Sequence, residues 1–264
     1  MKSWLLALDR ILRGESTRTG NLRDGTFEIP LGGMTVLIVL LGMIYGFGTG
    51  TFALFKEGGP SWPQFFASAV KIPLLFLLTL LITFPSLYVF NALVGSRLSA
   101  LSTLRLLVAT LVVIMTVLAS FGPIVAFFSV STTSYSFMVL LNVAMCAVAG
   151  FLGLAFLRQT LQRLAISLGL APAPRIISPA GTTPPASAPP AMPGALEGAE
   201  GQVLSGHVRI VFRCWMVLFA IVGSQMGWVL RPFIGAPDQP FSLFRSRRSN
   251  FFEGAWEHLL ALFR

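Results

Sequence analysis

The sequence predicts an all-α integral membrane protein with about five transmembrane helices and an amphipathic interfacial helix at each end. Only 11% of the 264 residues are charged and 55% are hydrophobic, whereas about 25% of the residues of a soluble domain are charged. Alternating strands of a membrane barrel are absent, and lipid admits only helices or closed barrels. Five apolar runs each supply the roughly 20 residues of helix that cross a bilayer: 31–55, 72–94, 106–128, 135–157 and 208–230.

The N-terminal segment, residues 1–29, begins with the stretch "SWLLALDRILRGE". Ser3 is a suitable N-cap. The residues that follow divide into an apolar face (Trp4, Leu5, Leu8, Ile11 and Leu12) and a charged face (Asp9, Arg10 and Arg13). Such a helix lies in the membrane interface or packs on the body of the protein, and both alternatives stay open. "WLLAL" is too short for the apolar region of a cleavable signal peptide.

The first apolar run contains "GMIYGFGTG", which places Gly42, Gly46 and Gly50 at intervals of four residues. Small residues at this spacing let two membrane helices approach closely, and we favour packing within the chain over dimerisation. The next stretch, 60–70, carries Trp62, Phe65 and Phe66 and predicts a short interfacial turn of helix.

Two of the following apolar runs contain an internal proline, Pro85 in the second and Pro123 in the third. Proline removes a backbone hydrogen bond and bends a helix. We interpret both as packing bends, although kinked helices also occur along transport pathways. The fourth run keeps helical leucine spacing as far as Gly169, a suitable helix stop. Residues 30–170 are therefore expected to form a four-helix transmembrane block.

Residues 171–206 differ in composition from the rest of the chain. They hold eight of its 17 prolines and no aromatic residue. Such a segment buries too little apolar surface to offset its conformational entropy. We predict a disordered linker over 171–206, followed over 207–264 by the fifth transmembrane helix and a C-terminal interfacial helix.

Lys and Arg residues favour a cytoplasmic N-terminus, because basic loops stay on the cytoplasmic side. With five spans, the N-terminal side carries eleven bases: Lys2, Arg10, Arg13, Arg18, Arg23, Arg97, Arg105, Arg158, Arg163, Arg175 and Arg209. The opposite side carries seven: Lys56, Lys71, Arg231, Arg245, Arg247, Arg248 and Arg264. The basic tail keeps one alternative open, in which one apolar run is re-entrant and the tail returns to the cytoplasm.

Candidate catalytic, metal-binding and cofactor-binding groups are not apparent. The five runs contain no Asp or Glu, Arg213 is the only base well inside one, and His207 and His258 flank or lie outside them. Cys146 and Cys214 both lie in apolar runs, which favours neither a disulfide framework nor a zinc site. We therefore expect no enzymatic activity, no cofactor and no metal. The net charge of +9 is expected to serve membrane topology and anionic headgroups rather than nucleic acid.

Among the amides within apolar runs, Asn142 lies in the fourth run and Gln225 in the fifth. We expect them to form structural hydrogen bonds between helices. The alternative is that they line a pore for a neutral solute.

The end of the fifth run reads "GSQMGWVLRPFIGAPDQPFSLFRSRRSN". Trp228 is suited to the headgroup level, Arg231 can stack on its ring, and Pro232 ends the helix. Gly227, Trp228, Arg231, Pro232, Phe233 and Gly235 thus form a candidate structural or partner-binding motif. Asn250 and Glu253 then form a capping-box pattern that predicts an amphipathic helix over 250–263.

These stretches resemble a family of uncharacterised bacterial multi-pass membrane proteins. The resemblance rests on "DRILRGE", on "IPLGGM" with "GMIYG", and on a C-terminal motif written GWxxRPFxG, then FR, then NFFE. It covers most of the chain except 171–206. It implies location in a bacterial inner membrane and implies no catalytic activity.

The sequence therefore predicts a non-enzymatic subunit or scaffold of a membrane complex. Expected partners are anionic membrane lipids and either another protein or a second copy of the chain. The alternative function is that of a small-solute permease or channel.

Overall fold

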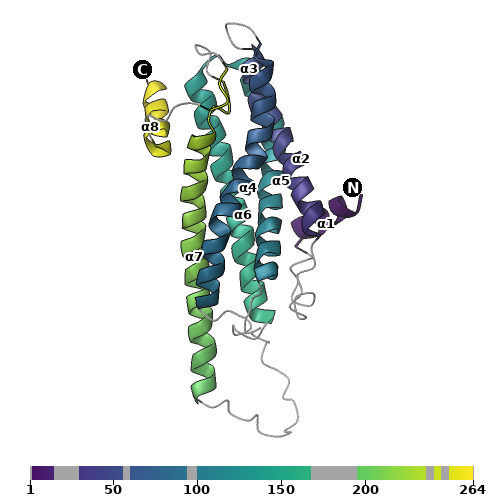
Figure 1. The fold of residues 1–264 in the computed structure, drawn as a ribbon, viewed down its shortest axis with the longest axis vertical. Coiled ribbons are helices and arrows are strands. Elements are labelled where there is room, and N and C mark those ends of the chain that lie inside the picture. Colours follow the sequence, from purple (N-terminus) through teal and green to yellow (C-terminus); the bar gives the residue numbers. More distant parts are fainter. Residues whose placement is uncertain are drawn as a thin grey trace, which may run out of the picture.

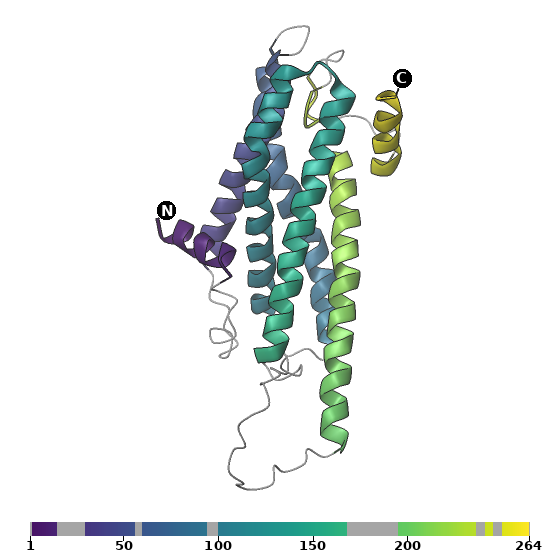
Figure 2. The same cartoon turned by 180° about the vertical axis from the view of Figure 1, so that it is seen from behind.

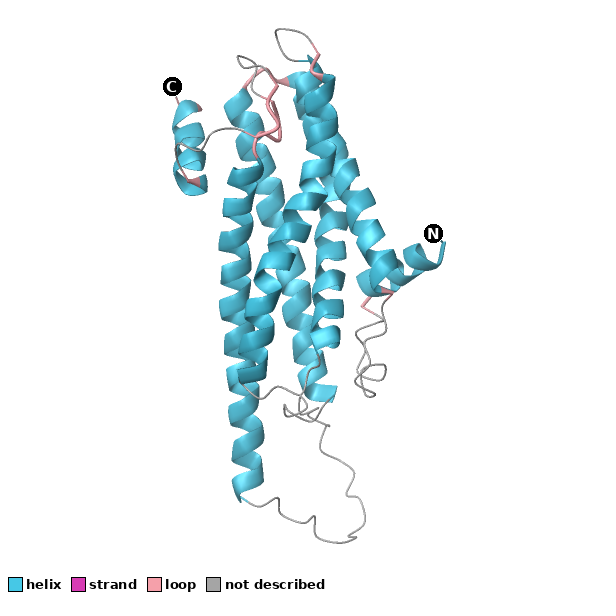
Figure 3. Ribbon diagram, in the orientation of Figure 1, coloured by secondary structure: helices cyan, strands magenta, loops and turns pink. Residues whose placement is uncertain are grey.

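The computed structural model describes residues 2–14, 30–55, 60–93, 100–167, 195–235, 241–244 and 250–263. These residues form helices and short connections and contain no strand (Figure 3). The helices are α1 (Lys2–Leu12), α2 (Leu31–Gly50), α3 (Phe52–Phe55), α4 (Trp62–Leu93), α5 (Ala100–Ser131), α6 (Tyr135–Ser167), α7 (Ala195–Leu230) and α8 (Phe251–Ala261).

The five long helices form an elongated bundle in which consecutive helices run in opposite directions (Figures 1 and 2). Helix α2 packs between α4 and α5, α6 packs on α5, and α7 packs on α4. Within the described part of the chain, five helical stretches are long and apolar enough to cross a membrane: Leu31–Phe55, Trp62–Val89, Ala100–Ser131, Tyr135–Arg163 and Arg213–Leu230. The prediction of an all-α membrane protein with five such helices is confirmed.

The glycines of α2 bring three helices into close contact. A Cβ added at Gly46 would lie 2.6 Å from the Ala69 Cα of α4, and one at Gly50 would lie 2.9 Å from the Phe65 carbonyl. On the other side, a Cβ at Gly48 would lie 2.6 Å from the Gly122 carbonyl of α5. The prediction that this glycine pattern packs within the chain is confirmed, because only glycine permits such short distances between backbones.

Helix α4 begins at Trp62 and continues without a break to Leu93. The separate interfacial turn predicted at 60–70 is therefore wrong, since these residues are the first turns of a membrane-spanning helix. Pro73 and Pro85 lie inside α4, and Pro123 lies inside α5. Near Pro85, the indole of Trp215 in α7 donates to the Thr83 carbonyl at 3.1 Å.

Helix α1 lies across the bundle beside the start of α2 (Figure 1). Leu8 and Ile11 are buried against the core, and Trp4 covers Gly33, where an added Cβ would lie 2.6 Å from the indole. Of the two alternatives left open by the sequence, packing on the body of the protein is observed. Leu5, Leu6 and Leu12 remain exposed.

Helix α7 begins at Ala195, so the last residues of the linker predicted over 171–206 are helical in the structure. The reason is local: Pro193 is the last proline before the fifth span, and the stretch that follows it, "ALEGAE", contains good helix formers. Residues 171–194 lie outside the described part of the chain, as does Gly169.

Candidate functional site

A buried polar stripe runs along the first turns of α4. Gln64, Ser68 and Lys71 are spaced by four and three residues, so their side chains share one helix face. Their relative exposures are 2%, 0% and 3%. Because these residues lie inside the apolar stretch Trp62–Val89, each needs a polar partner within the protein.

The partners are backbone carbonyls of residues 231–235, the exit segment, and of Leu243. The Pro232 carbonyl accepts from Gln64 Nε2 and from Lys71 Nζ, each at 3.0 Å. The Phe233 carbonyl accepts from Ser68 Oγ. Leu243 contributes a carbonyl that accepts from Lys71 Nζ at 2.5 Å. We call this set of three side chains and three carbonyls the exit site.

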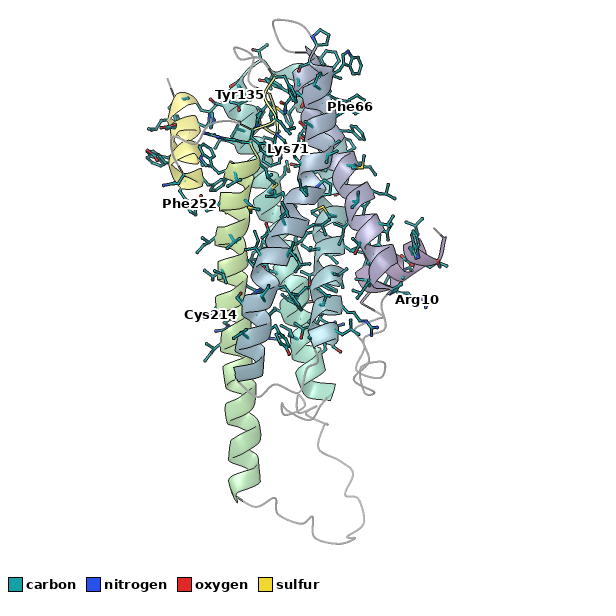
Figure 4. The ribbon with its side chains drawn as sticks, viewed as in Figure 1. Arg10, Phe66, Lys71, Tyr135, Cys214 and Phe252 are labelled. Atoms are coloured by element: carbon teal, nitrogen blue, oxygen red, sulfur yellow. The ribbon has the colours of Figure 1, made fainter. Side chains whose placement is uncertain are left out.

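Lys71 occupies the centre of the exit site (Figure 4). Its ammonium joins the carbonyls of two segments and lies 5.4 Å from the centre of the Phe244 ring. From the sequence, Lys71 was expected in a loop, and Arg213 was expected to be the only base well inside an apolar run. In the structure Lys71 is buried in α4 inside an apolar stretch, so Arg213, which is exposed, is not the only base in such a position. The signal that was overlooked is the spacing of Gln64, Ser68 and Lys71 along one helix face.

Trp228 and Arg231 form a layer beside the exit site. The Arg231 guanidinium lies 3.8 Å from the centre of a Trp228 ring, as the motif predicts. On α8, Gly254 contacts the same indole, and a Cβ there would lie 1.9 Å from Trp228 Cη2. The stack therefore connects the end of α7 to α8.

The remaining residues of the predicted motif have different environments. Gly235 has a φ of +54°, which suits glycine, and a Cβ there would lie 2.8 Å from Gln64 Cγ. Pro232 is buried and Phe233 packs against the core. Gly227 faces open space, since an added Cβ would have no atom within 4 Å. The structure thus brings every residue of the motif except Gly227 into the contacts around the exit site.

His258 docks α8 on the start of α6. Its Nδ1 lies 3.1 Å from Ser136 Oγ, and its ring meets Tyr135 edge to face at a centroid distance of 5.5 Å. Burial lowers the pKa of His258, Glu257 raises it and Arg231 lowers it. The first turn of α8 is capped as predicted, because Asn250 Oδ1 accepts from the Glu253 amide at 2.9 Å.

The two intramembrane amides behave differently. Asn142 Oδ1 accepts from the hydroxyl of Tyr45 at 2.7 Å, which joins α6 to α2. This is the predicted hydrogen bond between helices. Gln225 is half-buried in α7 and makes no hydrogen bond to any other residue that the structure describes.

The exit site holds the chain after α7 against α4. Its donors hold backbone carbonyls in place, and in the described ranges no three His, Cys, Asp or Glu residues gather where they could hold a metal ion. Comparison of the chain with protein-family models, with curated proteins and with solved structures found no match.

Proposed function

We propose that this membrane protein is a non-enzymatic subunit or scaffold of a membrane complex and that a partner helix packs against α6 and α7. The observation that carries the proposal is an uneven burial of the five spans. In the most apolar stretches of the first three spans, 44% of the residues are buried within the chain. The corresponding shares are 17% for α6 and 11% for α7, and these two helices contact each other only sparsely.

Gln225 supports a protein partner on this face rather than lipid alone. Its amide lies five residues before the end of α7 and has no hydrogen-bond partner among the described residues. Amides facing lipid gain stability by bonding to a neighbouring helix, at about 0.6–2 kcal/mol per bond. A partner helix beside Gln225 would supply that bond.

The alternative, a permease or channel, receives less support. Asn142, one of its two candidate pore residues, already bonds with Tyr45, a side chain with 0% exposure. This candidate pore residue is therefore already bonded within the bundle.

Purification in native lipid discs tests the proposal. We expect a second protein in fixed stoichiometry, or a second copy of the chain, and we expect Gln225→Leu to reduce its recovery severalfold. Ser224→Ala is the matched control, because the Ser224 hydroxyl bonds to the Ala220 carbonyl of its own helix at 2.8 Å. Recovery of a monomer alone would contradict the proposal, and solute flux in liposomes would favour the permease.

We further propose that the protein resides in a bacterial inner membrane with its N-terminus in the cytoplasm, as the family resemblance and the bases imply. Arg10, Arg13, Arg158, Arg163 and Arg213 are exposed, and Arg163 of α6 donates to the Gly14 carbonyl, just after α1, at 3.5 Å. Lys71 no longer counts as a loop charge on the opposite side, because it is bound within the exit site. Its removal from that count strengthens the positive-inside argument.

A further inference from the structure

Helix α8 has three distinct faces. Gly254 and His258 contact the bundle, and Glu253 and Glu257 form an exposed acidic edge. A third set of side chains, the outward face, is large, apolar and exposed: Phe252 (58%), Trp256 (60%), Leu259 (37%), Leu260 (44%) and Phe263 (84%). The apolar side of this amphipathic helix thus points away from the protein that carries it.

The depth of α8 follows from the exit site. Because the Pro232 carbonyl bonds to Gln64 and Lys71, α7 ends level with the first turns of α4, which lie inside a span. Helix α8 then runs alongside the end of the bundle rather than beyond it (Figures 1 and 2). Its contacts agree with this position, since Gly254 meets Trp228 of α7 and His258 meets Tyr135 of α6. The outward face therefore lies beside the outer turns of the spanning helices.

We propose that α8 is inserted in the membrane leaflet on the C-terminal side and that phospholipid acyl chains cover its outward face. The spans that α8 contacts, α6 and α7, also expose apolar side chains, among them Val148, Phe151, Val217 and Ile221. Aromatic side chains are favoured at this level of a bilayer.

The basic residues that precede α8 in the sequence also favour phospholipid. Arg245, Arg247 and Arg248 lie in the sequence between Phe244 and Asn250, and a basic cluster beside a membrane helix attracts anionic headgroups. Lipid thus matches both the apolar face and the charge next to it. The proposal is separate from that of a protein partner, which concerns the faces of α6 and α7.

Photo-crosslinking tests whether phospholipid covers the outward face of α8. A benzophenone amino acid replaces Trp256 or Phe252 in separate variants, and it replaces Phe251, which is half-buried, as a matched control. After irradiation in discs of phosphatidylethanolamine and phosphatidylglycerol, we expect an added mass of one phospholipid at both outward positions. We expect adducts within the chain at the control position, which also reports that α8 is docked.

A second measurement uses the native Trp256 side chain as the probe. Brominated phospholipids should quench the fluorescence that is lost on Trp256→Phe, which isolates the signal of that one indole. Adducts to a second copy or to another protein at the outward positions would overturn the proposal. So would adducts confined to the chain, or an unquenched Trp256. A lipid adduct is expected whether or not a protein partner binds α6 and α7, so the two proposals fail independently.

Discussion

At the scale of single residues, Lys71 and the exit segment stabilise each other. An ammonium in an apolar setting is costly unless it is hydrogen-bonded, and non-helical backbone at membrane depth needs protein partners for its carbonyls. The carbonyls of Pro232 and Leu243 meet both requirements at once. A lysine that would destabilise a bare transmembrane helix therefore anchors the chain where α7 ends.

Replacing Lys71 by Met tests this anchor. The Pro232 carbonyl keeps Gln64 as a donor, so the loss falls mainly on the bond to the Leu243 carbonyl, and a hydrogen bond to a charged group contributes about 1.5–3 kcal/mol. We expect a lower Tm in detergent and faster proteolysis of the C-terminal tail. Arg213→Met, which removes an exposed base, should change little. Equal stability of Lys71→Met and the wild type would mean that the hydrogen bonds of Lys71 only offset the free-energy cost of burying its charge.

His258 should make the docking of α8 depend on pH. Burial lowers its pKa below the ordinary value of 6.5, so the folded state favours the neutral ring. The contribution of the neutral His258 ring to the free energy of unfolding is fully present above about pH 6.5. It is lost as the pH falls through the lowered pKa of the folded state. We expect the Tm of the wild type to fall between pH 7 and pH 5 by more than that of His258→Gln, which cannot be protonated. Parallel Tm profiles would exclude this role for His258.

At the scale of elements, sequence patterns predicted what depends on local composition. The five apolar runs, the α2 glycines and the Asn250 cap were all predicted, because length, spacing and side-chain type determine them. Burial of Lys71 was missed, since a lysine beside a proline-rich loop reads as a loop charge until the partner carbonyls, more than 150 residues away, are known. The separate turn at 60–70 was wrong for a related reason: helix packing continues α4 through residues that resemble an interfacial segment.

The contact between α8 and α7 should be sensitive to one methyl group. On helix propensity alone, Gly254→Ala would stabilise α8 by about 0.5–1 kcal/mol. The added Cβ, however, would lie 1.9 Å from Trp228 Cη2, and the indole cannot move without disturbing its stack with Arg231. We expect a net loss of about 1–3 kcal/mol, typical of overpacking, measured by thermal unfolding.

Gly150→Ala is the matched control for that change. Gly150 lies inside α6, and a Cβ there would have no atom within 4 Å. Only the helix propensity then changes, so the control should be slightly more stable than the wild type. Equal stabilisation of both variants would mean that Gly254 does not pack against Trp228.

At the scale of the whole molecule, the number of spans and the alternation of helix directions follow from the sequence, whereas the neighbours of each helix do not. Apolar residues cover most sides of every span, so composition does not tell which side faces a neighbour and which faces lipid. The packing of α2 between α4 and α5 depends on glycines on two of its faces. The hydropathy of the sequence does not predict that α6, α7 and the outward face of α8 are exposed, because lipid-facing and buried side chains are equally apolar.

The orientation of the chain in the membrane is open to a direct test. Five spans that alternate in direction place the segments before α2 and after α7 on opposite sides of a membrane, and the bases on the N-terminal side favour the cytoplasm. A C-terminal reporter that is active only outside the cytoplasm should therefore be active, and a fluorescent protein that folds only in the cytoplasm should be dark there.

In inside-out vesicles, protease should cut first within residues 171–194 and release a fragment that retains α2 to α6. A cytoplasmic C-terminus would contradict this arrangement, since one of the five helices would then have to re-enter the membrane on the side from which it came. The basic tail after α7 gives that outcome its only support in the sequence. The exit site opposes it, because the carbonyls of Pro232, Phe233 and Leu243 tie the chain after α7 to the start of α4. That end of the bundle is the one remote from the end of α4 and from the start of α7, so these bonds hold the described residues after α7 on the side where α4 begins.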